Sequence, residues 1–169
     1  MPATALDSSI FRDIFGTEAM RAVFSDESRV QFYLDIEAAL ARVSYFQGLG
    51  AATIAEVAQL LRPSDFATGT VVIRRGQPGD CMYFIVTGEV TVDLKPQPLV
   101  LGAGEFFGEM ALITGEPRSA TVAARTNCEL LHLDLADFRH LEARHPEVAK
   151  LIDAEAKRRR AEPFGMRQS

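Results

Sequence analysis

Between residues 66 and 94, short runs of β-branched and aromatic residues alternate with residues typical of tight turns. The segment reads FATGTVVIRRGQPGDCMYFIVTGEVTVDL, and the turns are G-Q-P-G-D, T-G and, just beyond it, K-P-Q-P. Such runs predict short strands joined by tight turns. Residues 119–135, SATVAARTNCELLHLDL, predict two more strands. Strands at this spacing, with no long helix between them, favour an antiparallel roll or barrel over a parallel sheet.

Helical periodicity flanks the strand block on both sides. Residues 16–24 and 25–43 predict two helices before it, and residues 51–63 predict a third that ends at its final proline. Residues 135–160 predict two helices with a break before Pro146. The expected fold class is α+β, an antiparallel, jelly-roll-like β-roll with flanking helices. The expected division is a helical N-terminal extension at 1–43, a roll domain at 44–160 and a disordered tail at 161–169.

The composition narrows the classes of partner. A net charge of −5 gives no general attraction to nucleic acid, and no apolar run reaches the roughly 20 residues of a membrane span. The first residues lack the features of a signal peptide, and two cysteines make no disulfide framework, so a cytoplasmic protein without direct membrane insertion is expected. No nucleophile-elbow pattern is present, so no catalytic residue is expected. No metal site is expected either, because the histidines lack ligand spacing with cysteines or carboxylates: His132, His140 and His145.

One stretch places an acid and a base among small and apolar residues. Residues 105–122 read EFFGEMALITGEPRSATV, in which Gly108 and Glu109 precede Arg118. Residues 108–112 can form a helical turn whose unpaired N–H groups suit a phosphate, and the Arg118 guanidinium also suits phosphate oxygens. Glu109 would repel a bare phosphate, but its carboxylate can accept a hydrogen bond from a ribose 2′-hydroxyl. The pair therefore indicates a compact nucleotide site.

This stretch resembles the phosphate-binding cassette of cyclic nucleotide-binding domains, whose pattern is F-G-E-x-A/S-L followed by x-R-x-A. The resemblance covers roughly residues 46–160, through the G-x-x-G-D turn and the segment YFIVTGEV. It is greatest to the compact domains of bacterial cyclic nucleotide-regulated potassium channels. The chain matches every position of the cassette: Phe107, Gly108, Glu109, Ala111, Leu112, Arg118 and Ala120.

The resemblance implies a role for individual residues. Glu109 would accept the ribose 2′-hydroxyl, and Arg118 would pair with the cyclic phosphate. Val92 and Leu99 would pack against the purine, and Arg159 would cap the base as part of a C-terminal lid helix. The backbone N–H groups that could share the phosphate belong to Gly108, Met110, Ala111, Ser119 and Ala120.

The residue after the cassette arginine bears on the choice of base. In this family a threonine there helps to recognise cGMP, whereas this chain has Ser119. The resemblance therefore implies a preference for cAMP, with cGMP tolerated because a hydroxyl remains. The expected function is a cyclic nucleotide-binding regulatory module whose ligand closes the lid helix. The sequence does not indicate which effector it regulates.

Plainer interpretations of the same residues stay open. Arg118 could be a surface arginine paired with Glu116, and Glu109 could serve only the dipole of a helix N-terminus. The basic run 157–160 could be a solvated helix face that supplies no contact to a base. The whole domain could be a degenerate member of the family, a non-binding interaction domain on the same fold.

Residues 8–43 resemble a second family, the carboxymuconate cycloisomerases of the fumarase/aspartase superfamily. The shared pattern is F…FGT/S…M…FSD…R.Q..LD.EAALA, and it stops near Val43. The catalytic residues of that superfamily lie far downstream, so the likeness implies helices without lyase activity. A remnant of such an enzyme is a further alternative. The helices could instead cover the roll or pair two copies as a homodimer, and the join near Val43 could be natural or engineered.

Overall fold

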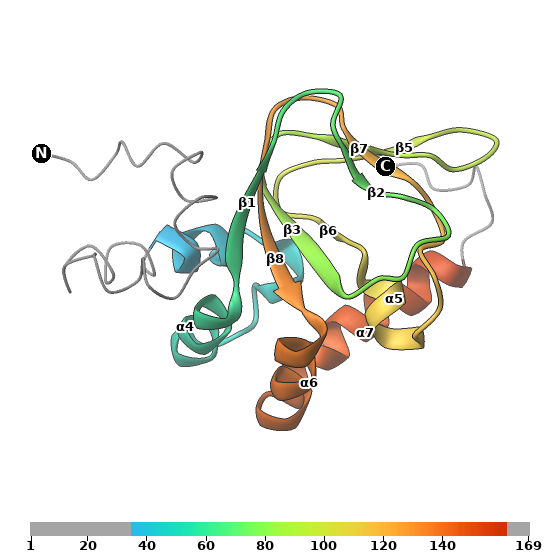
Figure 1. The fold of residues 1–169 in the computed structure, drawn as a ribbon. Coiled ribbons are helices and arrows are strands. Elements are labelled where there is room, and N and C mark those ends of the chain that lie inside the picture. The colour runs from blue at the N-terminus through green and yellow to red at the C-terminus, as the bar shows by residue number, and fades with distance from the viewer. Residues whose placement is uncertain (1–34, 162–169) are drawn as a thin grey trace, which may run out of the picture.

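The computed structural model describes residues 35–161, a β-roll with helices gathered at one end (Figure 1). Residues 35–41 are helical and are followed by a 3-10 helix, η1, and by the helix α4. Eight strands come next, with the short helix α5 between the sixth and the seventh, and two helices complete the domain. The bounds are η1 Ser44–Phe46, α4 Ala51–Leu60, β1 Arg62–Phe66, β2 Val71–Ile73, β3 Cys81–Thr87, β4 Val90–Val92, β5 Leu99–Leu101, β6 Phe106–Phe107, α5 Glu109–Thr114, β7 Val122–Ala124, β8 Cys128–Asp134, α6 Leu135–Arg144 and α7 Pro146–Ala161.

The strands form two antiparallel sheets of four strands each. The strand order is β1-β8-β3-β6 in one sheet and β2-β7-β4-β5 in the other. In the first sheet, Tyr83 of β3 is opposite His132 of β8 on one side and Phe107 of β6 on the other. The expected α+β roll with flanking helices is therefore confirmed.

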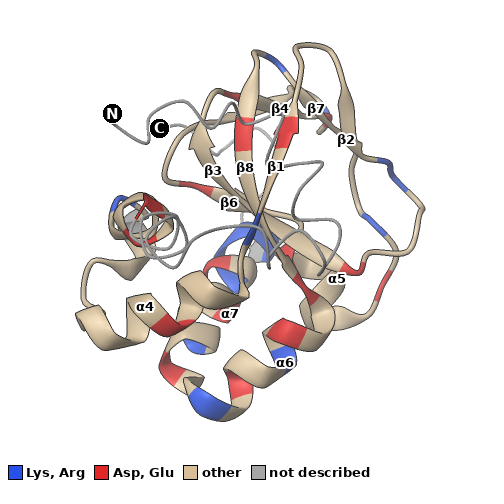
Figure 2. Cartoon of the chain, turned by 60° about the vertical axis from the view of Figure 1, so that its left-hand side comes forward, with Lys and Arg blue, Asp and Glu red and all other residues tan. Residues whose placement is uncertain are grey.

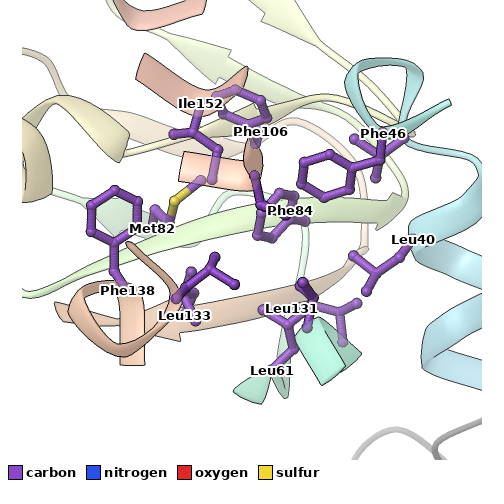
Figure 3. Close-up of a cluster of buried hydrophobic side chains, with 14 of the residues drawn as sticks. Leu40, Phe46, Leu61, Met82, Phe84, Phe106, Leu131, Leu133, Phe138 and Ile152 are labelled. Carbon is purple, nitrogen blue, oxygen red and sulfur yellow. The ribbon is translucent and has the colours of Figure 1, made fainter. Parts of the chain in front are cut away.

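Side-chain alternation along β6 sends two adjacent phenylalanines into two separate cores. Phe106 enters the cluster between the first sheet and the helices, and Phe107 enters the cluster inside the roll. Their exposed fractions are 0% and 2%. The first cluster also contains Phe84, Phe138 and Ile152 (Figure 3). Both rings thus fix β6, and with it the cassette that follows, from the two faces of the sheet.

The helix end expected at Pro63 is wrong. Helix α4 ends at Leu60, and Arg62–Phe66 pair with β8 as strand β1. Because β1 is an edge strand, a proline without an N–H group can occupy it without removing a central ladder bond. Helical periodicity does not reveal this strand, because its partner β8 is the last of the described strands and lies far along the chain.

The expectations for the N-terminal extension fall mainly outside the described residues. Within the helix expected at 25–43, residues 35–41 are helical. The helix expected at 16–24, the cycloisomerase-like segment before residue 35 and the tail after residue 161 lie outside the described part of the chain. Pairing of two copies through the N-terminal helices therefore stays a prediction.

Charged residues of both signs are interspersed along the last two helices, α6 and α7 (Figure 2). Among residues 35–161, no helix combines the length and the apolar character that crossing a membrane requires.

A charged contact joins α4 to the elbow between the last two helices. Helix α6 ends at Arg144 and α7 begins at Pro146, which confirms the expected break and puts a proline where no intrahelical donor is lost. His145, between the two helices, contacts Glu56 of α4 through Nε2 and Glu147 of α7 through Nδ1, the latter at 3.3 Å. Arg144 also reaches Glu56, with 3.5 Å between Nη2 and Oε1.

We expect the contact between His145 and Glu56 to make the stability of the fold depend on pH. The hydrogen bond to Glu56 raises the pKa of His145 above its ordinary 6.5, and the same bond lowers the pKa of Glu56 below 4.5. The stabilisation is present while both groups are charged. It is lost as the pH rises through the raised pKa of His145, and again as the pH falls through the lowered pKa of Glu56. Because the contact is at the surface, His145→Gln should lower the melting temperature by only about 1–3 °C near pH 5.5–6, and less at pH 8.5.

The measurement is a series of melting curves of the wild type and His145→Gln between pH 5 and 9. Burial lowers the pKa of His132, so that histidine contributes stability above its ordinary 6.5 that is lost at lower pH. This opposite dependence is common to both proteins and cancels in their difference. A difference in melting temperature that does not change with pH would contradict the assignment to His145.

Candidate functional site

Two glycines bracket the short helix that carries the cassette acid. Strand β6 ends at Phe107, and Gly108 turns the chain with φ of +85° before α5 begins at Glu109. At the other end Gly115 has φ of 72°, and its N–H donates to the carbonyl of Ala111. Side chains other than hydrogen disfavour this left-handed region. The two glycines therefore place a six-residue helix directly after the sheet, which confirms the helical turn expected here.

Arg118 is buried beside the cassette and pairs with no acidic side chain in the described part of the chain. It is 8% exposed. Its Nη1 donates to the carbonyl of Gly108 at 2.9 Å, and its Nη2 donates to the carbonyl of Cys81 at 2.7 Å. No carboxylate of residues 35–161 forms an ion pair with it, and the interpretation as a surface partner of Glu116 is wrong. Since a buried charge without a counter-charge is costly, the position suits an anion that a ligand brings.

Two further glycines leave room for the Arg118 side chain. A Cβ atom on Gly79 would lie 2.3 Å from Cβ of Ala111 and 2.7 Å from Nε of Arg118. A Cβ atom on Gly108 would lie 2.9 Å from Nη1 of Arg118. The backbone of Arg118 is itself hydrogen bonded to residues 76–77, at 2.8 Å in both directions. The loop between β2 and β3 thus forms one wall of the arginine site.

Glu109 is almost fully buried and pairs with an arginine of the last helix. It is 1% exposed, and Nη1 of Arg159 donates to its Oε1 at 2.7 Å. The same guanidinium donates from Nη2 to the carbonyl of Phe106 at 2.7 Å and from Nε to Oε1 of Glu155 at 3.0 Å. Burial opposes the charge of Arg159, but the carboxylates of Glu109 and Glu155 outweigh it and raise its pKa. Glu109 therefore does more than favour the dipole of α5.

The side chains of the basic run 157–160 differ in their exposure to solvent. The Arg159 side chain is 13% exposed, whereas those of Arg158 and Lys157 are 46% and 75% exposed. Arg159 therefore lies against the cassette and fastens α7 to it. Its contact with a base stays a prediction.

Strands β4 and β5 place two apolar side chains beside the cassette. Val92 is directly opposite Leu99 in the antiparallel pair. Both pack in the core inside the roll, which also contains Phe107 and Ala120. The structure thus brings the residues predicted to meet the purine together with two residues of the cassette.

The remaining cassette positions differ in exposure. Ala111 is buried, Met110 is half-buried and Ser119 is exposed. The Ser119 hydroxyl is therefore accessible at the edge of the site.

Several residues of the site had no role in the sequence prediction. Gly79 belongs to the G-Q-P-G-D turn, so a signal for it existed, but its contact with Arg118 was not predictable from the turn alone. Cys81 takes part through its backbone carbonyl, which any residue has. Tyr45 and Glu155 lie beyond Arg159, and their contacts depend on how α7 packs.

An antiparallel roll to which α7 is fastened, with a buried arginine that no acid of residues 35–161 neutralises, is an arrangement suited to a small anionic ligand. Residues 63–145 match the family described as the cyclic nucleotide-binding domain. The chain therefore carries a domain of the cyclic nucleotide-binding family.

Known proteins support this assignment at the level of sequence and of fold. The chain is 46% identical over 140 residues to a cyclic nucleotide-gated potassium channel of Rhizobium etli, a match that covers 83% of the chain and 39% of the channel. It thus spans well under half the length of that relative.

Two solved structures share the fold. The regulatory domain of Toxoplasma gondii protein kinase A with cAMP has a TM-score of 0.71 and 24% identity, over 85% of this chain and 56% of that one. The regulatory subunit of a cAMP-independent protein kinase A from Trypanosoma brucei has a TM-score of 0.68 and 21% identity, over 86% of this chain and 51% of that one.

Proposed function

We propose that this domain binds a cyclic nucleotide, cAMP in preference to cGMP, and acts as a regulatory module and not as an enzyme. The observation that carries the proposal is the state of Arg118, which is buried, donates to carbonyl oxygens and pairs with no acid among the described residues. A cyclic phosphate presents a negative charge on two unesterified oxygens, which suits the planar fork of a guanidinium.

Glu109 supplies the acceptor for the ribose. Its contact with Arg159 uses Oε1, and a carboxylate offers several lone-pair sites on two oxygens. The 2′-hydroxyl can therefore donate to Glu109 while the ion pair persists. The purine would lie against Val92 and Leu99, which form the apolar wall next to the cassette.

Ligand binding would act on α7 through the same carboxylate. Arg159 joins α7 to Glu109, so a ligand that orders Glu109 favours the arrangement in which α7 is fastened to the cassette. This is a population shift between arrangements of α7. Because the chain matches part of a potassium channel, we propose that α7 reports to an attached or associated effector, with the domain in the cytoplasm.

The competing function is a non-binding interaction domain. The fold alone does not decide between the two, because a regulatory domain solved with cAMP and the regulatory subunit of a cAMP-independent kinase both share it. Arg118 favours binding, since its buried charge has no acidic partner among residues 35–161 and burying such a charge is costly unless a ligand supplies an anion.

Calorimetric titration with cAMP, cGMP, 5′-AMP and adenosine tests the proposal. We expect micromolar or tighter binding of cAMP, weaker binding of cGMP and no measurable binding of adenosine, which lacks the phosphate. A saturating amount of cAMP should also raise the melting temperature, because it binds the folded state only. If neither cyclic nucleotide binds the folded domain, the proposal is wrong and the interaction domain is favoured.

Ser119→Thr should shift the preference towards cGMP. The β-branched threonine keeps the hydroxyl at this exposed position and restricts its rotamers, which favours one direction of its hydrogen bond. One neutral hydrogen bond contributes about 0.5–1.5 kcal/mol, so the ratio of the cAMP and cGMP dissociation constants should change by roughly 2- to 12-fold. The matched control is Ser119→Ala, which should lower affinity for cGMP more than for cAMP. An unchanged ratio in both variants would remove Ser119 from base selection.

A further inference from the structure

The guanidinium of Arg159 is fixed at all three of its nitrogen atoms. Nη1 donates to Glu109, Nη2 to the carbonyl of Phe106 and Nε to Glu155. The centre of the guanidinium also lies 4.8 Å from the centre of the Phe106 ring. A planar group held on every side has one orientation, and the orientation of Glu109 follows from it.

Glu155 is the buried acid on which this arrangement depends. It is 4% exposed and lies one helical turn before Arg159 on α7. Arg158 donates to both of its oxygens, at 2.8 Å from Nε and 2.5 Å from Nη2. Burial opposes the charge of Glu155, yet hydrogen bonds from Arg158 and Tyr45 lower its pKa to about 2. It is therefore ionised throughout the range in which a nucleotide would bind.

Tyr45 connects Glu155 to the segment before the roll. It belongs to η1, and burial and, after it, the neighbouring Glu155 carboxylate raise the pKa of its hydroxyl. Its ring packs against the Phe106 ring, with 4.9 Å between the centroids. A continuous set of contacts thus runs from η1 through Glu155 and Arg159 to the carboxylate of Glu109.

The set contains as many carboxylates as guanidinium groups. Glu109 and Glu155 supply two carboxylates, and Arg158 and Arg159 supply two guanidinium groups. If the charge of Glu155 is removed, Arg159 keeps one carboxylate instead of two, and its Nε keeps only a neutral acceptor, which holds it more weakly. Its guanidinium is then held less firmly and can shift on Glu109, which disturbs the acceptor without touching the site of Arg118.

We propose that Glu155 is a positioning residue for sugar recognition: through Arg159 it orients Glu109 towards the ribose 2′-hydroxyl, and through Tyr45 it links that orientation to η1. The inference rests on the proposed binding of a cyclic nucleotide. It adds a buried residue on α7 that makes no contact of its own with the ligand, and it connects the sugar end of the site to the chain before the roll.

The test compares cAMP with 2′-deoxy-cAMP, which lacks only the hydroxyl in question. Both dissociation constants are measured by calorimetry for the wild type, Glu155→Gln and Tyr45→Phe. The dissociation constant of 2′-deoxy-cAMP divided by that of cAMP measures recognition of the 2′-hydroxyl, and this quotient is the ratio used below. Glutamine keeps the size of the side chain and removes its charge, so Glu155→Gln should lower the ratio by at least about threefold, with binding of 2′-deoxy-cAMP nearly unchanged. Tyr45→Phe, which removes one hydroxyl, should lower the ratio less.

The matched control is Asp153→Asn. Asp153 is also an acid on α7, and it pairs with Lys157 at 2.9 Å, but its side chain is 37% exposed and that of Lys157 is 75% exposed. The control removes the same charge from the same helix and should leave the ratio unchanged. An equal loss of affinity for both nucleotides in Glu155→Gln would show a merely structural role and overturn the proposal.

The remaining outcomes are also decisive. If Glu155→Gln does not fold, Tyr45→Phe carries the test, and an unchanged ratio in that variant overturns the link to η1 and the positioning role with it. If the wild type binds neither nucleotide, the proposed function itself fails. If instead the wild type binds both nucleotides and Glu155→Gln shows the same ratio as the wild type, only the positioning role of Glu155 fails.

Discussion

Arg118→Ala is expected to weaken cAMP binding by about 1.5–3 kcal/mol, the range for hydrogen bonds to charged groups, or roughly 12- to 160-fold in the dissociation constant. The reason is the buried position of the guanidinium and the absence of an acidic partner among residues 35–161. Calorimetric titration of the variant with cAMP gives the value directly. An unchanged affinity would remove Arg118 from the site.

Two control variants separate charge from geometry at this site. Arg118→Lys keeps a positive charge but loses the planar fork that donates to the carbonyls of Gly108 and Cys81, so it should recover only part of the affinity. Glu109→Gln should weaken binding less than Arg118→Ala, because an amide oxygen still accepts a hydrogen bond from the ribose. If Glu109→Gln weakened cAMP binding more than Arg118→Ala, contacts to the ribose and not those to the phosphate would contribute most to the affinity.

Gly79→Ala is expected to damage both the fold and the site. The added Cβ would lie 2.3 Å from Cβ of Ala111 and 2.7 Å from Nε of Arg118, so α5, the arginine or the loop must move. Overpacking of this kind costs about 1–3 kcal/mol of stability. Displacement of the Arg118 guanidinium should also weaken cAMP binding by about tenfold or more, since geometry decides the strength of a charged hydrogen bond.

Urea unfolding and calorimetry on the same variant measure the two effects. The matched control is Gly48→Ala, because a Cβ atom there meets nothing within 4 Å and the glycine is not in the left-handed region. Gly48→Ala should leave cAMP affinity unchanged and alter stability little. A Gly79→Ala protein with wild-type stability and affinity would mean that the loop between β2 and β3 yields easily, contrary to its hydrogen bonds with the Arg118 backbone.

The local parts of the site could be predicted from the sequence because they lie in one short segment. Gly108, Glu109 and Arg118 fall within residues 105–122, and the pattern of that segment indicated a phosphate and a sugar hydroxyl before any fold was known. The fold class was predictable for a similar reason, since strand and turn signals are local. The structure confirms the roll and the short helix α5.

The long-range parts could not be predicted in the same way. The contact between Arg159 and Glu109 joins residues 50 positions apart, and it depends on where α7 packs. In the sequence Glu155 is one acid among several in a charged helical segment, and its burial distinguishes it from Asp153. The helix end was placed at Pro63 because a proline near a helix end is a strong local signal, whereas the pairing of β1 with β8 joins segments far apart in the sequence.

The arrangement of Phe106 and Phe107 has a consequence for the redesign of this domain. Their rings fill different cores, so a change in the size of either ring would need compensating changes among a different set of neighbours. The cassette therefore depends on the packing of two separate cores, and we expect it to tolerate few substitutions at Phe106 and Phe107. Attempts to give the domain a new nucleobase preference should leave these two phenylalanines unchanged. They should vary Val92 and Leu99, which form one apolar wall, or Ser119, which is exposed.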